Sequence, residues 1–222
     1  SSVDVSPSVV AVDSSGAMIT VTLRDEFGNA IEGKQVKLTA DSATASVSPS
    51  VGSTDRSGKV TFRVSDMKAE TVSLTVTEVE SATDFDPVEV IFVPGAPSSI
   101  SFIGVSKTIV KADGEDSATV TVTVRDRFGN VVPGIAVKLS AKPAVAIIEA
   151  VDDGITDAQG EADFMLTSTH SEKVTITASF EGVSLPPVQI EFYDGAADPA
   201  FSRAEAWVAS VTADGSAFTT IT

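Results

Sequence analysis

The sequence contains no cysteine among its 222 residues. Disulfide frameworks, thiolate metal sites and thiol nucleophiles are therefore excluded. It also lacks any run of about 18 apolar residues, the length that a membrane-spanning helix requires. We therefore expect no direct membrane insertion of this segment. Aromatic residues make up only 6% of the chain, with one Trp and one Tyr, which leaves few rings for an exposed ligand-binding platform.

Basic residues are scarce. The chain holds 15 Lys and Arg against 31 Asp and Glu, a net charge of −16. Residues 1–96 and 97–197 each contribute 7 basic and 14 acidic side chains. A field of this sign repels phosphate backbones, so we expect no nucleic-acid partner and no anionic membrane partner. An acidic surface suits a secreted protein and, where carboxylates converge, a hard cation such as Ca²⁺.

Catalytic motifs are missing as well. The sequence has no GxSxG, Walker loop, HExxH or redox pair, the short motifs that would indicate an enzyme. The only histidine, His170, lies in a turn with no neighbouring partner for acid–base work. Asp152 and Asp153 are adjacent and point apart, whereas a glycosidase needs two acids about 5–9 Å apart across a cleft. We expect no enzyme, no catalytic residue and no cofactor, Ca²⁺ being the single candidate.

The sequence is rich in alternation of apolar and polar residues with a period of 2, which predicts half-buried strands. No segment sustains the i, i+3, i+4, i+7 spacing of a helix, and Val, Ile and Thr dominate the alternating runs. Helix should be nearly absent. The expected strands cover Ile19–Leu23, Val36–Leu38, Val60–Val64, Val72–Val76, Val88–Phe92, Val120–Val124, Val137–Leu139, Ala162–Leu166, Val174–Phe180 and Val188–Phe192.

A repeat divides the chain. The stretch ITVTLRDEFGNAIEGKQVKLTA (Ile19–Ala40) returns as VTVTVRDRFGNVVPGIAVKLSA (Val120–Ala141), with 13 of 22 positions identical at a spacing of 101 residues. Such a period predicts tandem modules. We place the first module at residues 1–95 and the second at 96–197, with a short, stiff linker at VPGAP. Residues 198–222 read as the start of a third repeat, because VTADGSAFTTIT matches VKADGEDSATVT 101 residues earlier. Trp207 in this fragment could anchor a ligand, but we expect it to cover a seam between modules or the edge of a core.

Turn residues recur at the same places in both modules. Glycine and asparagine tolerate positive φ, and Asp accepts backbone N–H bonds in tight turns. The expected turn residues are Gly28, Asn29, Gly33, Asp55 and Gly58 in the first module, and Gly129, Asn130, Gly134, Asp157 and Gly160 in the second. About seven short strands per hundred residues between such turns predict an all-β fold of tandem immunoglobulin-like Greek-key β-sandwiches.

The order ADG, TVTVRDxxGNxxPGxxVxLS, TDxxGxAxFxLTST and KVTITASFEG resembles the bacterial immunoglobulin-like repeat of the invasin and intimin type, and both modules match along nearly their full length. This resemblance implies a location at the bacterial cell surface, in the rod-like extracellular region of an adhesin. It implies adjacent repeats of the same chain as partners, with a host receptor or a neighbouring protomer as further candidates. It implies no catalytic residues.

One loop is unusually acidic. TEVESATDFDP (Thr77–Pro87) carries Glu78, Glu80, Asp84 and Asp86, where the second module has only FEGVSLPP. Four carboxylates on one flexible loop could bind Ca²⁺, and the alternative is a solvated acidic loop. A second version places Ca²⁺ between the modules, where loops with Asp126, Asn130 and Asp157 are expected to face loops with Asp41, Asp66 and Glu70.

The function expected from these features is a non-catalytic stalk or spacer segment of a larger bacterial surface adhesin, which projects a tip and contributes to cell adhesion. Two alternatives stay open. One is a subunit or decoration domain of a filament or virion that assembles by strand addition. The other is an accessory domain of a secreted carbohydrate-active enzyme.

Overall fold

The structure, a computed structural model, describes residues 1–195 and 202–203. It is all-β, as the alternation predicts, and its only helical element within those residues is a single 3₁₀ turn, η1 (Asp152–Gly154). No helix in the described part of the chain is long and apolar enough to cross a membrane. The predicted third repeat at 198–222 and Trp207 lie outside the described residues, apart from positions 202 and 203.

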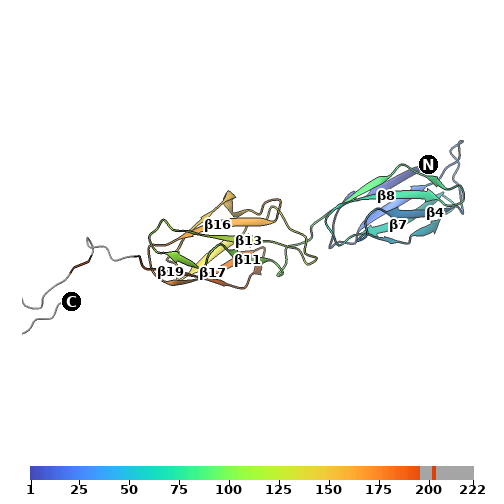
Figure 1. Ribbon diagram of the computed structural model, residues 1–222. Coiled ribbons are helices and arrows are strands. Elements are labelled where there is room, and N and C mark those ends of the chain that lie inside the picture. Colours follow the sequence, from blue (N-terminus) through green and yellow to red (C-terminus); the bar gives the residue numbers. More distant parts are fainter. Residues whose placement is uncertain (196–201, 204–222) are drawn as a thin grey trace, which may run out of the picture.

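The first sandwich is built from ten strands in two sheets (Figure 1). One sheet has the order β1-β3-β7-β5, and the other has the order β2-β10-β8-β4-β6 with β9 paired to β8. The strands are β1 (Ser2–Ser6), β2 (Val9–Ala11), β3 (Ala17–Thr22), β4 (Gln35–Ala40), β5 (Ser46–Ser48), β6 (Val51–Ser53), β7 (Lys59–Ser65), β8 (Thr71–Glu78), β9 (Thr83–Asp84) and β10 (Val88–Val93).

The second sandwich repeats this plan with sheets β11-β13-β16-β15 and β12-β19-β17-β14, and β18 pairs with β17. In both sandwiches the first strand lies in one sheet and the second crosses to the other, where β2 and β12 run parallel to β10 and β19. The strands are β11 (Phe102–Val105), β12 (Ile109–Lys111), β13 (Ala118–Thr123), β14 (Lys138–Lys142), β15 (Ile147–Ala150), β16 (Glu161–Thr167), β17 (Lys173–Phe180), β18 (Val183–Ser184) and β19 (Val188–Tyr193).

Each sandwich has its own core. Alternate side chains of the long strands point inward, as the buried and exposed alternation along β7 and β8 shows. Phe62, Phe92 and Leu74 are fully buried in the first core, and Phe192, Leu166 and Ile176 in the second. The buried residues form two separate clusters, one per sandwich. Burial of these side chains supplies the main stabilisation of each sandwich independently of the other.

The predicted turn glycines adopt positive φ: Gly28 85°, Gly33 79°, Gly58 74°, Gly129 92°, Gly134 77° and Gly160 73°. Asn29 and Asn130 do not, although the sequence suggested that they would share this task. The preceding glycine supplies the left-handed residue, and each asparagine side chain instead donates to an aspartate four residues earlier. The side-chain oxygen and the second N–H of each asparagine amide then remain available for other hydrogen bonds.

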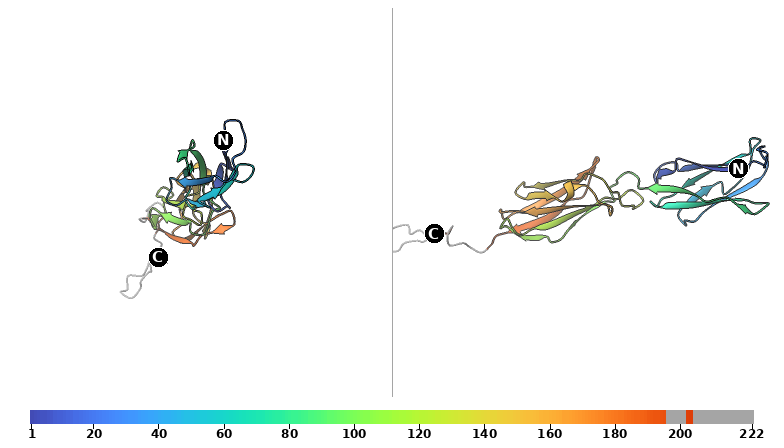
Figure 2. Two further views of the ribbon diagram at one scale, coloured as in Figure 1. Left: turned by 90° about the vertical axis from the view of Figure 1, so that its right-hand side faces the viewer. Right: turned by 90° about the horizontal axis from the view of Figure 1, so that it is seen from above.

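The two sandwiches lie end to end, joined by the segment from Pro94 to Ser101 (Figures 1 and 2). We call the end of a sandwich where the chain enters its leading end and the opposite end its trailing end. The trailing end of the first sandwich meets the leading end of the second at this segment. The resulting shape is an elongated rod in both perpendicular views of its length.

Candidate functional site

A cluster of side-chain and backbone hydrogen bonds lies where the two sandwiches meet. At its centre is the RDRFGN loop (Arg125–Asn130), which follows β13 at the leading end of the second sandwich. Asp126 organises this loop: its Oδ1 accepts hydrogen bonds from the backbone N–H groups of Phe128 at 2.9 Å and Asn130 at 3.0 Å. The Asn130 Nδ2 donates to Asp126 Oδ2 at 2.8 Å. An aspartate side chain that accepts from the backbone N–H groups two and four residues later stabilises a tight turn. The turn therefore depends on the presence of Asp at this position.

Asn130 then reaches across the junction. Its Nδ2 donates to the carbonyl oxygen of Met67 at 2.9 Å, and its Oδ1 accepts from the N–H of Ala69 at 2.9 Å. Met67 and Ala69 belong to the loop between β7 and β8 at the trailing end of the first sandwich. One amide side chain therefore pairs with both a donor and an acceptor of the neighbouring backbone. The two bonds form together only in one relative orientation of the sandwiches, because Nδ2 must face the Met67 carbonyl while Oδ1 faces the Ala69 N–H.

The connecting segment is tied to both sandwiches. The Gly95 N–H donates to Asp126 Oδ2 at 2.9 Å, and the Ala96 N–H donates to Asp13 Oδ2 of the first sandwich at 3.1 Å. Pro97 forms an isolated antiparallel bridge with Asp126. A Cβ placed on Gly95 would lie 2.7 Å from Asp13 Cγ, closer than real Cβ contacts. A larger residue at position 95 would therefore have to push the exposed Asp13 side chain aside.

Asp126 is fully buried at the junction, with 0% of its surface exposed. Burial raises the pKa of its carboxyl group, but the hydrogen bonds from Asn130, Gly95 and Phe128 outweigh this effect, and the net pKa lies below its usual value of 3.8. A buried carboxylate that accepts several N–H bonds stays ionised. The charge therefore strengthens the hydrogen bonds that hold the connecting segment and the loop together.

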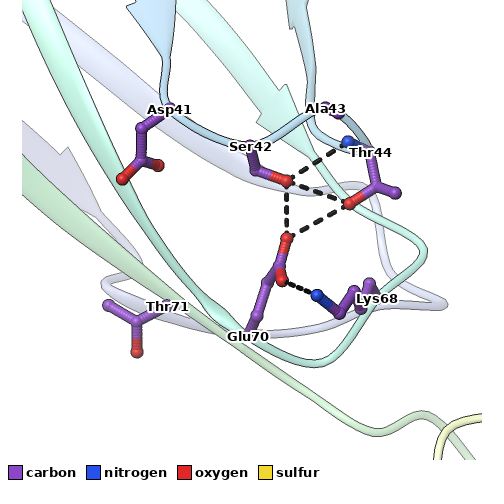
Figure 3. A pocket seen from close by; sticks show the side chains of 7 residues that line it. All are labelled: Asp41, Ser42, Ala43, Thr44, Lys68, Glu70 and Thr71. Carbon is purple, nitrogen blue, oxygen red and sulfur yellow. Dashed lines mark hydrogen bonds and ion pairs between the residues drawn. The ribbon is translucent and has the colours of Figure 1, made fainter.

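An open pocket of about 330 Å³ lies nearby on the first sandwich (Figure 3). Glu70 occupies it: its Oε1 accepts from Ser42 Oγ at 2.5 Å and from Thr44 Oγ1 at 3.2 Å, and Lys68 forms an ion pair with its other oxygen. Hydrogen bonds from Lys68 and then Ser42 lower the pKa of Glu70 to about 2, against an opposing effect of burial. The Glu70 carboxylate is therefore satisfied by its own neighbours in the pocket.

The acidic segment predicted as a flexible loop is a hairpin. Thr77 and Glu78 of β8 pair with Asp84 and Thr83 of β9. Glu78 is buried and accepts from the backbone N–H of Ser81 at 2.9 Å and from its hydroxyl group. These two bonds from Ser81 lower the pKa of Glu78 against the effect of burial.

The other three carboxylates of this hairpin do not converge on one point. Glu80 forms an ion pair with Lys34, and Asp84 accepts from Thr77 Oγ1 at 2.6 Å. Asp86 is exposed. Within residues 1–195, no group of three or more Asp, Glu or His is arranged to hold a metal ion. Calcium binding at this hairpin stays a prediction.

Of the residues predicted to face each other across the junction, Asn130 lies against the β7–β8 loop, which also contains Asp66 and Glu70. The carboxylates of these two residues have separate local roles. Asp66 is buried with its Oδ1 accepting from the Lys68 N–H at 2.9 Å, while its Oδ2 has no hydrogen-bond partner among the described residues. Asp41 accepts from the N–H of Ser73 at 2.9 Å.

Two other predicted turn residues, Asp55 and Asp157, accept hydrogen bonds only within their own turns in the described part of the chain. Asp55 accepts from the N–H groups of Ser57 and Lys59, at 2.8 and 2.9 Å. Asp157 accepts from Gln159 and Glu161 in the same way, at 2.9 and 3.0 Å. His170 lies in the loop between β16 and β17, with its Nδ1 3.3 Å from the hydroxyl oxygen of Thr169.

Sequence reasoning missed Asp13, Gly95 and the backbone of Met67 and Ala69 as parts of the junction. A signal for Gly95 was present, since it lies between two prolines at the predicted boundary. The backbone groups carry no signal in the sequence, because any residue supplies the same N–H and C=O.

The fold and the junction together define a tandem of immunoglobulin-like modules. The chain matches the family of bacterial Ig-like domains (group 1) over residues 1–93 and 100–193. It belongs to this family.

The chain is also similar to characterised surface proteins. It is 29% identical over 178 residues to the inverse autotransporter adhesin YeeJ of Escherichia coli (strain K12), which covers 78% of this chain and 8% of that protein. It is 30% identical over 154 residues to intimin of Citrobacter freundii, covering 68% of this chain and 16% of that protein. This chain thus spans a small part of the length of these relatives.

The solved structure of FdeC, an Escherichia coli adhesin, superimposes with a TM-score of 0.66 at 22% identity, covering 93% of this chain and 69% of that one. At this identity the likeness bears on the fold alone.

Proposed function

We propose that this chain is a spacer segment in the extracellular part of a bacterial surface adhesin, with no catalytic role of its own. The observation that carries the proposal is the end-to-end junction, where Asn130 and Asp126 hold two sandwiches in one line. Flexible linkers would let successive modules fold back on one another. A hydrogen-bonded junction keeps them in line, so that each module adds its full length to the end-to-end distance of the segment. Membership of the bacterial Ig-like family and similarity to YeeJ and intimin support the location at the cell surface.

The spacer role can be tested by measuring distances across the junction. Because the chain has no cysteine, Thr61→Cys in β7 and Thr119→Cys in β13 give two unique sites for spin labels on adjacent sandwiches. Both positions are exposed. We expect a narrow distance distribution by double electron–electron resonance, and Asn130→Ala should broaden it. A broad distance distribution in the labelled chain that keeps Asn130 would contradict a rigid spacer.

Surface location is tested separately. Antibodies against residues 1–195 should label intact cells of the source bacterium that carry the full-length protein, with a periplasmic protein as the negative control. Labelling only after permeabilisation would overturn the extracellular part of the proposal.

A further inference from the structure

The first sandwich carries a second copy of the junction loop at its own leading end. The RDEFGN loop (Arg24–Asn29) follows β3 as the RDRFGN loop follows β13. Asp25 Oδ1 accepts from the N–H groups of Phe27 at 3.0 Å and Asn29 at 2.8 Å, and Asn29 Nδ2 donates to Asp25 Oδ2 at 2.9 Å. The local geometry of the two loops is therefore the same.

The hydrogen bonds that hold the first arginine of each loop are the same as well. Arg24 donates to the carbonyl oxygen of Gly28 at 2.7 Å, as Arg125 does to that of Gly129 at 2.7 Å. The Ser1 hydroxyl bonds both backbone groups of Arg24, as the Ser101 hydroxyl does for Arg125. This places Ser1 at the position that Ser101 occupies after the connecting segment.

The two copies differ in what covers them. Asp126 is fully buried and Phe128 is 37% exposed, whereas Asp25 is exposed and Phe27 is 81% exposed. Asn29 Oδ1 accepts no hydrogen bond from the described residues, although the equivalent atom of Asn130 accepts from Ala69. The turn itself therefore forms without the three bonds that Asn130 and Asp126 make to Met67, Ala69 and Gly95. Those bonds serve the junction only.

We infer that the RDEFGN loop is a docking surface for the trailing end of another Ig-like module of this family. The occupant would present the backbone carbonyl and N–H of its β7–β8 loop to Asn29 and a connecting-segment N–H to Asp25 Oδ2, and it would cover Phe27. The same chain already holds an occupied copy of this surface, because the trailing end of the first sandwich contacts the RDRFGN loop of the second. This inference rests on the proposed spacer function and names the surface through which the line of modules extends.

The test is a fusion that adds residues 1–100 in front of residue 1 of the whole chain. Because Ser1 corresponds to Ser101, this fusion reproduces the connecting segment of the existing junction. Labels at Thr61→Cys of the added copy and Met18→Cys of the next sandwich match the Thr61 and Thr119 pair, since Met18 precedes Ile19 as Thr119 precedes Val120. We expect a distance distribution as narrow as that across the existing junction.

Asn29→Ala in the sandwich that follows the added copy should broaden that distribution at least twofold. In the unfused chain, the same substitution should leave the Thr61–Thr119 distribution unchanged. Asn29→Ser, which keeps a polar turn residue but cannot span the gap, should act like Asn29→Ala, and thermal melting of both variants checks that the sandwich is folded. A fusion that is already broad with Asn29 present, or that stays narrow in both variants, overturns the docking surface. If Asn130→Ala leaves the existing junction narrow, the role of the junction in the spacer fails instead, so the two failures are distinguishable.

Discussion

Gly95 lies in the connecting segment and contacts both sandwiches. Its N–H donates to Asp126, and its missing Cβ makes room for Asp13, which accepts from the next residue. In Gly95→Ala, the added methyl group would displace the Asp13 side chain and break its bond to Ala96. We expect amide exchange at Ala69 to become at least fivefold faster, because the junction opens more often, while both sandwiches keep their melting temperatures.

Gly104 in β11 is a matched control for this change. A Cβ at Gly104 meets nothing closer than the Thr121 carbonyl oxygen at 3.8 Å, an ordinary contact. Gly104→Ala should leave exchange at Ala69 unchanged. Equal exchange rates in the two variants would contradict a role for Gly95 in the junction.

Asp126 links the junction to pH. Its folded-state pKa lies below 3.8, so the ionised form contributes stability that is fully present above the unfolded-state pKa of about 3.9 and is lost as the pH falls through the lower folded value. Asp126→Asn places an amide donor against N–H donors and should cost about 1–3 kcal/mol at pH 7. The difference in melting temperature between wild type and variant should be constant above about pH 5 and shrink below about pH 4. A difference that is independent of pH down to pH 2 would contradict this assignment.

At the scale of elements, the long strands could be predicted from the sequence because burial alternates along them. Val60–Val64 lies within β7 and Val72–Val76 within β8. The short strands escaped prediction: β5 and β9 have three and two residues and expose most of their side chains. Both are held by hydrogen bonds to longer neighbours, β5 to β7 and β9 to β8. Two or three exposed residues are too few to show a periodicity.

The junction was predictable only in part for a related reason. Asn130 was recognised as a turn residue, because the signal for a turn is local, and its loop was expected to face the loop of Asp66 and Glu70. Its contacts with Met67 and Ala69 depend on how two separately folded sandwiches meet, and no spacing within one module encodes that.

The hairpin of β8 and β9 is the element at which the calcium hypothesis can be decided. An ion there would have to compete with Ser81 for Glu78 and with Lys34 for Glu80. The hypothesis predicts that a chelator lowers the melting temperature of the first sandwich by several degrees, since an ion at about 100 times its Kd contributes about 2.7 kcal/mol. Replacing Asp84 and Asp86 together by Asn should abolish that difference. Identical melting curves with and without chelator, in calorimetry on the wild type, would leave the hairpin as a solvated acidic element.

At the scale of the whole molecule, the two cores should unfold separately, because each sandwich buries its own cluster and the connection between them consists of a few hydrogen bonds. Val122 in β13 is fully buried. Val122→Asp places an unpaired charge in the second core, which should cost several kcal/mol and unfold that sandwich at a lower temperature. The transition of the first sandwich should stay in place, since sites far apart with no shared partners act independently.

Val21→Asp, at the equivalent buried position of the first sandwich, should give the opposite pattern, with the second transition retained. Thr119→Asp adds the same charge at an exposed position of β13 and should change neither transition by more than about 0.5 kcal/mol. Differential scanning calorimetry resolves the two transitions. If both Val122→Asp and Val21→Asp lowered a single shared transition, the junction would be a cooperative part of one folding unit, and a line of such modules would unfold as a whole. Separate transitions mean that a segment of this kind can lose one sandwich under load while its neighbour keeps its fold.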